Sequence, residues 1–455
     1  MTRIELKKSY VRLARVFSVT AALATMLLSV TSHAAIDGEE YLTSGPITLT
    51  ASEGYISIAD GGSIYSWGYS VDGSMQLPGP TLILTQGEEY TITLDNALPA
   101  AAGKVSIVFP GHDVTSTSGG DPGLLTQEAP SGGSVSYTFI AGQPGTYQYH
   151  SGTRPDFQVE MGLYGAIVVR PADASCAYNH ADTCFDREYL FLLSEIDLQV
   201  HQAAEDQSSG PGPIDIGTGS FTSEYWLLNG RAAPDTMAPA FDPILPSQPY
   251  NSLPRMHPGE KLLLRIVGAG REMHPFHTHG NHVRVLARDG RLLLSDMAPE
   301  TANPATDPLA GPLLFTIPSA PGGTVDGIFE WTGKDLGWDM YGTTDINPHS
   351  CDTDGGQHSV ATDPNYGEWC VDHDVPIPVD LPSLSSLAFG GFYSGSPYLG
   401  AMGSLPPGEG GLNPDSGFSF MWHSHNEREL VNNDVFPGGM MTMLIIEAPL
   451  IPISE

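Results

Sequence analysis

Histidines in three short motifs are the residues of this chain whose type and spacing could do chemistry. The motifs read YHSG at residues 149–152, HPFHTHG at residues 274–280 and WHSH at residues 422–425. The imidazole nitrogen is a borderline ligand that suits copper, zinc and iron. Because the chain gathers several of its 15 histidines in this way, it is a candidate metal-binding protein.

Two of the motifs contain a His-x-His pair, His277 with His279 and His423 with His425. On a β-strand both side chains of such a pair point to the same face, with Cα atoms ~6.6 Å apart. That spacing suits two neighbouring metal ions or one ion held from both sides. The face opposite His423 would point to the core and carries Phe418, Phe420, Trp422 and Ser424. A single pair would be a weak signal, but two pairs favour a metal site over a structural role.

Four cysteines form two local pairs, Cys176 with Cys184 and Cys351 with Cys370. In an oxidising compartment such pairs are typical of disulfides. The alternative for the second pair is a soft-metal site, because Cys370 lies three residues before His373. The disulfide is the favoured interpretation. We expect structural roles for the isolated histidines His112, His180, His201, His257, His349 and His358.

The elements that must position the motifs are short β-strands. The chain is rich in glycine (52) and proline (38), and only 16% of its residues are charged, a composition that favours strands joined by turns. Tyr90, Ile92 and Leu94 alternate with polar residues, which predicts a half-buried strand. Further strands are predicted at 136–139, 165–169, 189–193, 261–267, 283–287, 328–331, 418–422 and 443–446. No long amphipathic helix is predicted, so the fold class is all-β, a sandwich or a barrel.

A chain of 455 residues is long enough for two or three domains. We predict a first β domain over residues 35–172, a linker over 173–186 and a second β domain over 187–450. The second domain carries a long insertion at about 333–416 that is rich in Gly, Pro, Asp and Ser. Loops of this length are usually functional or disordered.

Residues 1–34 have the pattern of a secretory signal peptide. A stretch with five basic residues precedes an apolar run at 16–30, and small residues at 32–34 offer a cleavage site. The alternative is an anchor that is retained. Removal of residues 1–34 takes away five basic residues and one acidic residue, which changes the formal net charge from −33 to −37. Such a surface repels nucleic acid and anionic membranes and would attract cations, although solubility alone is the favoured role of the charge. We therefore expect an exported protein, periplasmic or secreted.

The chain resembles the multicopper oxidase family over most of its mature length. The segments PGPT at 78–81 and GTYQYHSG followed by QVEMGLYGAIVV within 145–169 resemble the first domain of that family. The segments HPFHTHGNHVRVLARDG at 274–290 and MWHSHNE with GGMM at 421–441 resemble its last domain. The resemblance implies two cupredoxin-like Greek-key β-sandwich domains and copper as the cofactor.

In this family, four His-x-His motifs hold a three-copper cluster that reduces dioxygen to water. The resemblance implies that His277 binds the type 2 copper and that the two type 3 coppers are bound by His150 with His425 and by His279 with His423. His274 matches a ligand of the separate type 1 copper. The metal-binding residues implied for the cluster are thus His150, His277, His279, His423 and His425.

The sequence also departs from the family pattern. The first His-x-His motif is missing, since residues 108–110 read VFP and His112 is out of register, and the second motif ends on Gly152. Ser424 replaces the type 1 cysteine, and Glu429 occupies the second type 1 histidine position. A serine hydroxyl cannot replace the thiolate on which a type 1 copper depends. Met440 or Met441 would be the remaining type 1 ligand besides His274.

Three functions are compatible with this pattern. The favoured one is a copper-dependent oxidoreductase with a partial cluster, whose partners are copper ions, dioxygen and a small reducing substrate. The alternative is a non-catalytic exported protein that binds or sequesters copper, for which Met440, Met441 and Met443 offer soft ligands, although core packing is the favoured role for these residues. The third is a structural descendant with a relic site. The site would form where the domains meet, within one chain or between the chains of a homotrimer.

Overall fold

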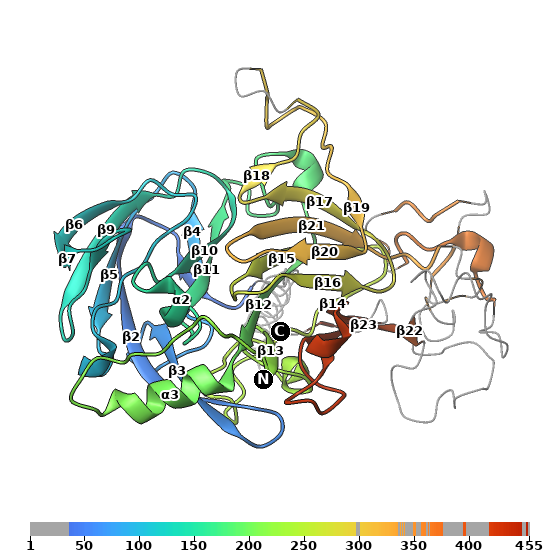
Figure 1. The fold of residues 1–455 in the computed structure, drawn as a ribbon. Coiled ribbons are helices and arrows are strands. Elements are labelled where there is room, and N and C mark those ends of the chain that lie inside the picture. The colour runs from blue at the N-terminus through green and yellow to red at the C-terminus, as the bar shows by residue number, and fades with distance from the viewer. Residues whose placement is uncertain are drawn as a thin grey trace, which may run out of the picture.

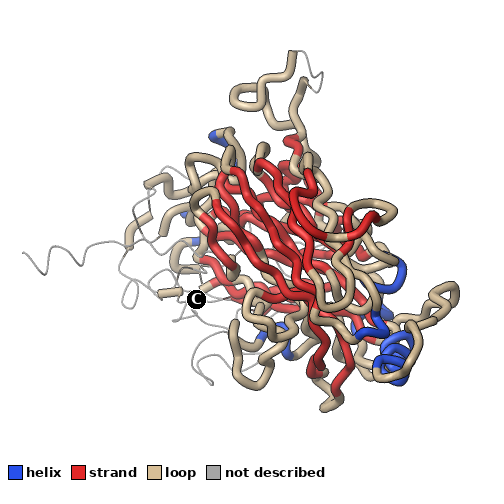
Figure 2. Tube along the Cα trace, turned by 90° about the vertical axis from the view of Figure 1, so that its left-hand side faces the viewer, coloured by secondary structure: helices blue, strands red, loops and turns tan. Residues whose placement is uncertain are grey.

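The computed structural model describes residues 36–296, 301–334, 337, 339, 341, 349–351, 356–360, 363, 365–375, 395–396, 418–447 and 452–453. The signal peptide predicted at residues 1–34 lies outside this part. Strands make up nearly all of the regular secondary structure of the described chain, which confirms the all-β prediction (Figures 1 and 2). Among the described residues, no helix has the length and apolar character needed to span a membrane.

The strands up to residue 170 form a first sandwich, drawn in blue to cyan in Figure 1. One sheet has the order β1 (Glu39–Tyr41), β4 (Leu82–Thr85), β11 (Tyr164–Arg170), β10 (Gly145–His150). The other has the order β3 (Ser63–Ser70), β2 (Gly45–Ser57), β5 (Glu89–Asn96), β9 (Ser134–Ile140), β6 (Thr115–Gly119). A small ribbon pairs β7 (Asp121–Pro122) with β8 (Gln127–Glu128). The short helix α2 (Pro155–Gln158) follows β10.

The strands from residue 187 form a second sandwich. Its first sheet has the order β13 (Tyr225–Leu228), β12 (Arg187–Ile196), β15 (Lys261–Gly268), β21 (Thr324–Glu330), β17 (Val283–Arg288), β18 (Arg291–Leu292), and β19 (Leu313–Leu314) pairs with β17. Its second sheet has the order β14 (Arg255–Met256), β24 (Met441–Ile446), β23 (Phe418–Ser424), β16 (His274–Thr278), β20 (Thr316–Ser319), and β22 (Gly395–Ser396) pairs with β23. The second sheet carries two of the three histidine motifs.

Alternation of side chains explains how the two sandwiches join. In β11, Ile167 and Val169 point into the core of the first sandwich, whereas Val168 points into a separate apolar layer. In β12, Phe191 belongs to the core of the second sandwich and Leu192 to the same separate layer. Every residue of β12 is therefore buried, because both faces of the strand are covered. The sandwiches are packed face to face through this layer.

A buried polar network crosses the same junction. Arg265 of β15 is fully buried and bonds to Glu188 of β12 at 2.9 Å and to Thr146 of β10 at 3.0 Å. Thr146 also donates to Asp326 of β21 at 2.6 Å, and Arg170 of β11 pairs with Glu188. Buried charges are tolerated only when they are paired in this way. The network therefore fixes how β10 lies against the second sandwich.

The disulfides of the chain were predicted from the sequence, whereas its longer helix was not. Both predicted disulfides, Cys176–Cys184 and Cys351–Cys370, are present. The helix α3 (Leu198–Ser208) was not predicted. Its N-cap is Asp197, whose carboxylate accepts hydrogen bonds from the backbone amides of Gln199 and Val200, and Val200 packs on the core of the first sandwich. This one apolar contact face is too narrow to give a helical pattern in the sequence.

Candidate metal centre

The antiparallel pairing of β16 with β23 brings two histidine motifs side by side. His277 lies opposite His423, and Phe276 lies opposite Ser424. On the core face, Phe276 and Trp422 are fully buried with ring centroids 6.4 Å apart. The histidines therefore share the other face of the sheet, as the alternation of side chains requires.

Four imidazole rings gather on that face. Ligand nitrogens of His277, His279 and His423 all lie within 4.8 Å of one another, and Nε2 of His423 lies 3.3 Å from Nε2 of His279. The ring centroid of His425 lies 4.8 Å from that of His277 and 5.7 Å from that of His423. The side chain of His425 is 50% exposed, and its Nδ1 lies 3.2 Å from a carboxylate oxygen of Glu427. The fold thus brings four of the five implied ligands together.

Neighbouring oxygen atoms orient the rings. Nδ1 of His423 lies 2.6 Å from the carbonyl oxygen of Ser424, and because a carbonyl only accepts, this nitrogen carries the proton. Nδ1 of His277 lies 2.8 Å from the hydroxyl of Thr316, which can accept in the same way. A histidine whose Nδ1 is engaged by an outer partner keeps the lone pair of Nε2 for a metal ion. The rings are therefore oriented as metal ligands are.

The electrostatics of the group also favour metal binding. Burial, together with the neighbouring His279, His423 and His425, lowers the pKa of His277 to about 3. Burial likewise lowers the pKa of His423. Both rings are therefore neutral at pH 7, and only a neutral imidazole can donate its lone pair to a metal.

His150 lies elsewhere, at the end of β10 in the first sandwich (Figure 1). Within the described residues, the group of ligand atoms that lie within 4.8 Å of one another does not include it. Its Nδ1 lies 3.0 Å from the carbonyl oxygen of Ser151, which repeats the arrangement of His423 with Ser424. Burial lowers the pKa of His150, so this ring is neutral as well. The chain thus orients the ring of His150 as a ligand, outside the group formed by His277, His279 and His423.

His274 has a different environment from the other motif histidines. It is fully buried, with Nε2 2.9 Å from a carboxylate oxygen of Glu195 and Nδ1 2.9 Å from one of Glu429. Burial alone would lower the pKa of His274, but the hydrogen bonds and charges of the two carboxylates outweigh burial and raise the pKa to about 9. At pH 7 the ring is thus an imidazolium held between two buried carboxylates.

The residues at the positions implied for a type 1 copper lie close to this triad. The backbone amide of Ser424 donates to Met440 at 2.9 Å, and the amide of Met440 donates to Glu429 at 2.8 Å. The Ser424 hydroxyl accepts from the amide of Asn426 at 3.2 Å. Of the two carboxylates that flank His274, the sequence indicated only one. Glu429 was identified by its position, but Glu195 lies 79 residues from His274 and no local signal marks it.

His112 and His349 were both expected to have structural roles, and the structure agrees only for His112. His112 stacks on Phe139 and Tyr147 with centroid distances of 4.7 and 4.6 Å, and burial lowers its pKa to about 4. It therefore has a packing role in the first sandwich, as expected. His349 does not stand alone, because it belongs to a second group of ligand-type side chains together with His373.

Comparisons with known proteins agree with this geometry. The model of the multicopper oxidase family matches residues 67–174. Laccase 1 of Metarhizium acridum is 31% identical over 158 residues, which are 34% of this chain and 23% of that protein. Copper resistance protein A of Pseudomonas syringae pv. tomato is 25% identical over 256 residues, which are 48% of this chain and 38% of that protein. The chain thus spans well under half the length of the curated relatives that it matches.

Solved structures show the same fold over nearly the whole chain. The multicopper oxidase mgLAC aligns with a TM-score of 0.52 at 17% identity and covers 91% of this chain and 89% of its own. The blue copper oxidase of Nitrosomonas europaea aligns with a TM-score of 0.50 at 16% identity, over 88% and 85% of the two chains. These structures show a cupredoxin-type fold. The chain is similar to multicopper oxidases, and the part that matches the model of that family is residues 67–174.

Copper is the cofactor of that family, and the residues present here fit it. Imidazole nitrogens suit copper, and the lowered pKa values of His277 and His423 keep these two rings neutral at pH 7. His277, His279 and His423 would hold the ion, with His425 beside them.

Proposed function

We propose that this protein is an exported copper-dependent oxidoreductase that oxidises a small reducing substrate with dioxygen. The observation that carries the proposal is the convergence of His277, His279 and His423 within 4.8 Å on the outer face of a rigid sheet. Copper bound there would supply one-electron redox chemistry. The protein supplies neutral, pre-oriented imidazoles, so no protons or rings have to be rearranged when the metal binds.

The same proposal includes the loss of the type 1 copper. Glu195 and Glu429 occupy both ring nitrogens of His274, so this histidine has no lone pair for a metal. Ser424 offers a hydroxyl where the resemblance implies a thiolate. Electrons therefore enter directly at the histidine group, and the substrate has to reach that group. The half-exposed ring of His425 marks the side from which it can approach.

The position of His150 leads us to propose a homotrimer in which this residue joins the histidine group of a neighbouring chain. Exposed apolar side chains flank both halves of such a site. Leu125, which is 58% exposed, lies beside Gly152 near His150. Phe315, which is 48% exposed, lies 5.6 Å from the ring of His277. Apolar side chains in such places are typical of protein interfaces.

Domain boundaries and location complete the proposal. We propose that the sandwiches are separate domains over residues 35–172 and 187–450, joined by the linker 173–186, and that residues 1–34 direct export. The two disulfides support an oxidising compartment, since such bonds persist mainly outside the cytosol.

Metal analysis and oxygen consumption test the central claim. Copper-loaded protein is expected to consume dioxygen with a phenolic reductant, whereas His277→Ala/His423→Ala is expected to lose both copper and activity. His112→Gln is the matched control, because His112 is a partly buried histidine outside the motifs that packs on the rings of Phe139 and Tyr147. Copper binding without any oxygen consumption would overturn the enzymatic proposal in favour of copper storage.

A complementation experiment tests the trimer. His150→Ala and His423→Ala/His425→Ala are each expected to be inactive. If each site in a closed ring takes His150 from one chain and the other histidines from the next, random mixing of the two variants restores about a quarter of the wild-type sites. A site within one chain cannot be restored by mixing. A mixture as inactive as its components would therefore exclude the shared site.

A further inference from the structure

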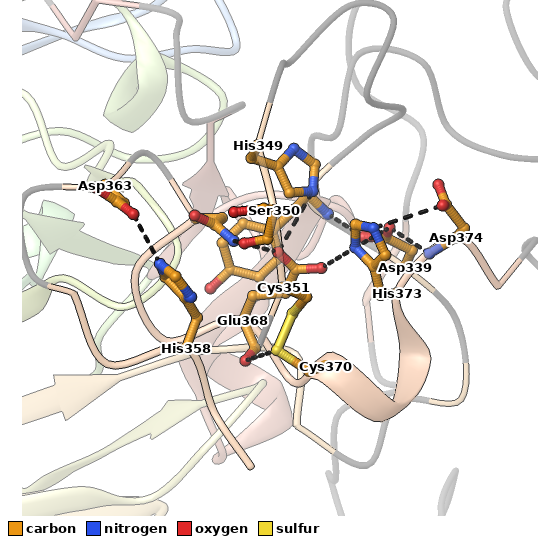
Figure 3. Close-up of polar contacts among 12 residues, drawn as sticks. Asp339, His349, Ser350, Cys351, His358, Asp363, Glu368, Cys370, His373 and Asp374 are labelled. Carbon is orange, nitrogen blue, oxygen red and sulfur yellow. Dashed lines mark hydrogen bonds and ion pairs between the residues drawn. A yellow bond between two sulfur atoms is a disulfide. The ribbon is translucent and has the colours of Figure 1, made fainter. Parts of the chain in front are cut away.

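A second group of ligand-type side chains lies in the insertion, away from the histidine motifs. Ligand atoms of Asp339, His349, Glu368 and His373 all lie within 4.8 Å of one another. Figure 3 shows the carboxylate of Glu368 between the rings of His349 and His373, with Asp339 beside His373. We propose that these four residues form a binding site for a divalent ion of the zinc class, independent of the copper centre.

The distances between the ligand atoms fit such an ion. Nδ1 of His373 lies 2.7 Å from Oε1 of Glu368 and 3.8 Å from Oδ2 of Asp339, and Nε2 of His349 lies 3.4 Å from Oε2 of Glu368. A tetrahedral zinc ion with ligands at about 2.0–2.2 Å separates them from one another by about 3.3–3.6 Å. The observed separations lie on both sides of this value, so small side-chain rotations suffice.

Charge and burial favour a cation at this place. The side chains of Asp339, Glu368 and His349 are 1%, 2% and 0% exposed. Within the described residues, the ion pairs of Asp339 and Glu368 are with histidines alone, and neither lysine nor arginine takes part. Burial of two carboxylates is costly unless positive charge compensates them. A divalent ion would supply two positive charges beside these carboxylates, whose partners in the chain are the imidazoles of His349 and His373.

Outer partners hold three of the ligands in place, as they do in metal sites. Asp339 accepts backbone amide bonds from Tyr341 on Oδ1 and from Asp374 on Oδ2, both at 2.8 Å. Nε2 of His373, the nitrogen that faces away from the group, lies 3.5 Å from the carboxylate of Asp374. Asn365 donates to Oε2 of Glu368 at 2.9 Å.

The site would tie the insertion to the second sandwich. Its ligands span residues 339–373, and the Cys351–Cys370 disulfide links the same two segments. Tyr341, which is 1% exposed, packs in the core of the second sandwich and donates to the carbonyl of Tyr366 at 3.1 Å. Because the disulfide uses both cysteines, the ion has to be held by nitrogen and oxygen. That donor set suits zinc better than the softer copper(I).

Zinc analysis in a chain that lacks the copper ligands tests the proposal. In the background His277→Ala/His279→Ala/His423→Ala, we expect one zinc ion per chain after loading and dialysis. The further change His349→Ala/His373→Ala is expected to remove it, and Glu368→Gln, which keeps the side-chain volume, is expected to weaken binding at least tenfold. His358→Ala is the matched control, because His358 pairs with Asp363 in the same insertion outside the group.

Two results would overturn the proposal. One is a background chain that retains no zinc although both disulfides are intact by thiol titration. The other is zinc retained equally with and without His349 and His373. Cobalt(II) gives a second readout, since visible absorption typical of four-coordinate nitrogen and oxygen ligation is expected in the background chain and should be absent after the further change His349→Ala/His373→Ala.

Discussion

The buried triad around His274 predicts a specific dependence of stability on pH. The perturbation is His274→Gln, which removes the imidazolium but keeps a polar side chain between Glu195 and Glu429. In the folded chain the pKa of His274 is raised from 6.5 to about 9. One pKa unit corresponds to 1.36 kcal/mol, so the protonated ring contributes about 3 kcal/mol to the free energy of unfolding.

The sign follows from the raised pKa. Because the folded pKa lies above the unfolded one, the stabilisation is complete below pH 6.5 and is lost as the pH rises through about 9. The free energy of unfolding of the wild type should therefore fall by about 3 kcal/mol relative to His274→Gln between pH 6.5 and pH 9.5. Groups that titrate in both proteins cancel in the difference.

Chemical denaturation of the metal-free proteins at several pH values, followed by tryptophan fluorescence, measures this difference. His112→Gln is the control. The pKa of His112 is lowered to about 4, so its ring is neutral above pH 6.5. The difference in the free energy of unfolding between the wild type and His112→Gln should therefore stay constant over this range. A constant gap between the wild type and His274→Gln over the same range would refute the reasoning, because it would mean that His274 is not protonated in the folded chain.

Three further outcomes are expected. Copper-loaded protein should show no intense blue absorption band, since Ser424 provides no thiolate; a strong band would require a cysteine at the site. Thiol titration under denaturing, non-reducing conditions should read near zero, and four reactive thiols would contradict both disulfides. Arg265→Met should leave Asp326 without its cation and Glu188 with Arg170 alone, and should lower the free energy of unfolding by about 3–5 kcal/mol without changing copper content. A loss below 1 kcal/mol in denaturation would show that the network does not hold the sandwiches together.

The strands that carry the histidine centre were predictable because their signal is local. The alternation of apolar residues over 418–422 predicts the buried face of β23, and Phe418, Phe420 and Trp422 are all buried. The same alternation predicts that the His-x-His pairs share one face. The structure places His277 and His423 there, opposite each other in the sheet. The disulfides were predictable for a similar reason, since each joins cysteines that are close in sequence.

Other features depend on contacts between residues far apart in the chain. The imidazolium of His274 exists because β12 places Glu195 against one ring nitrogen, whereas the sequence had suggested only a degenerate type 1 position. His349 was expected to have a structural role, and His373 was considered only together with Cys370. The disulfide takes Cys370 out of any metal site, but it also brings the segments of the two histidines together.

The sequence by itself determined the fold class, the resemblance to multicopper oxidases, copper as the expected cofactor and the shared face of each His-x-His pair. These follow from side-chain alternation and from motifs only a few residues long. The tertiary structure decided which histidines are neutral, which one is charged, and which ligands meet. Burial and the carboxylates of Glu195 and Glu429 set the pKa of His274, whereas burial and the neighbouring histidines set the pKa of His277. Strand register and burial between distant segments cannot be read from local spacing, because they arise only when the sheets pack.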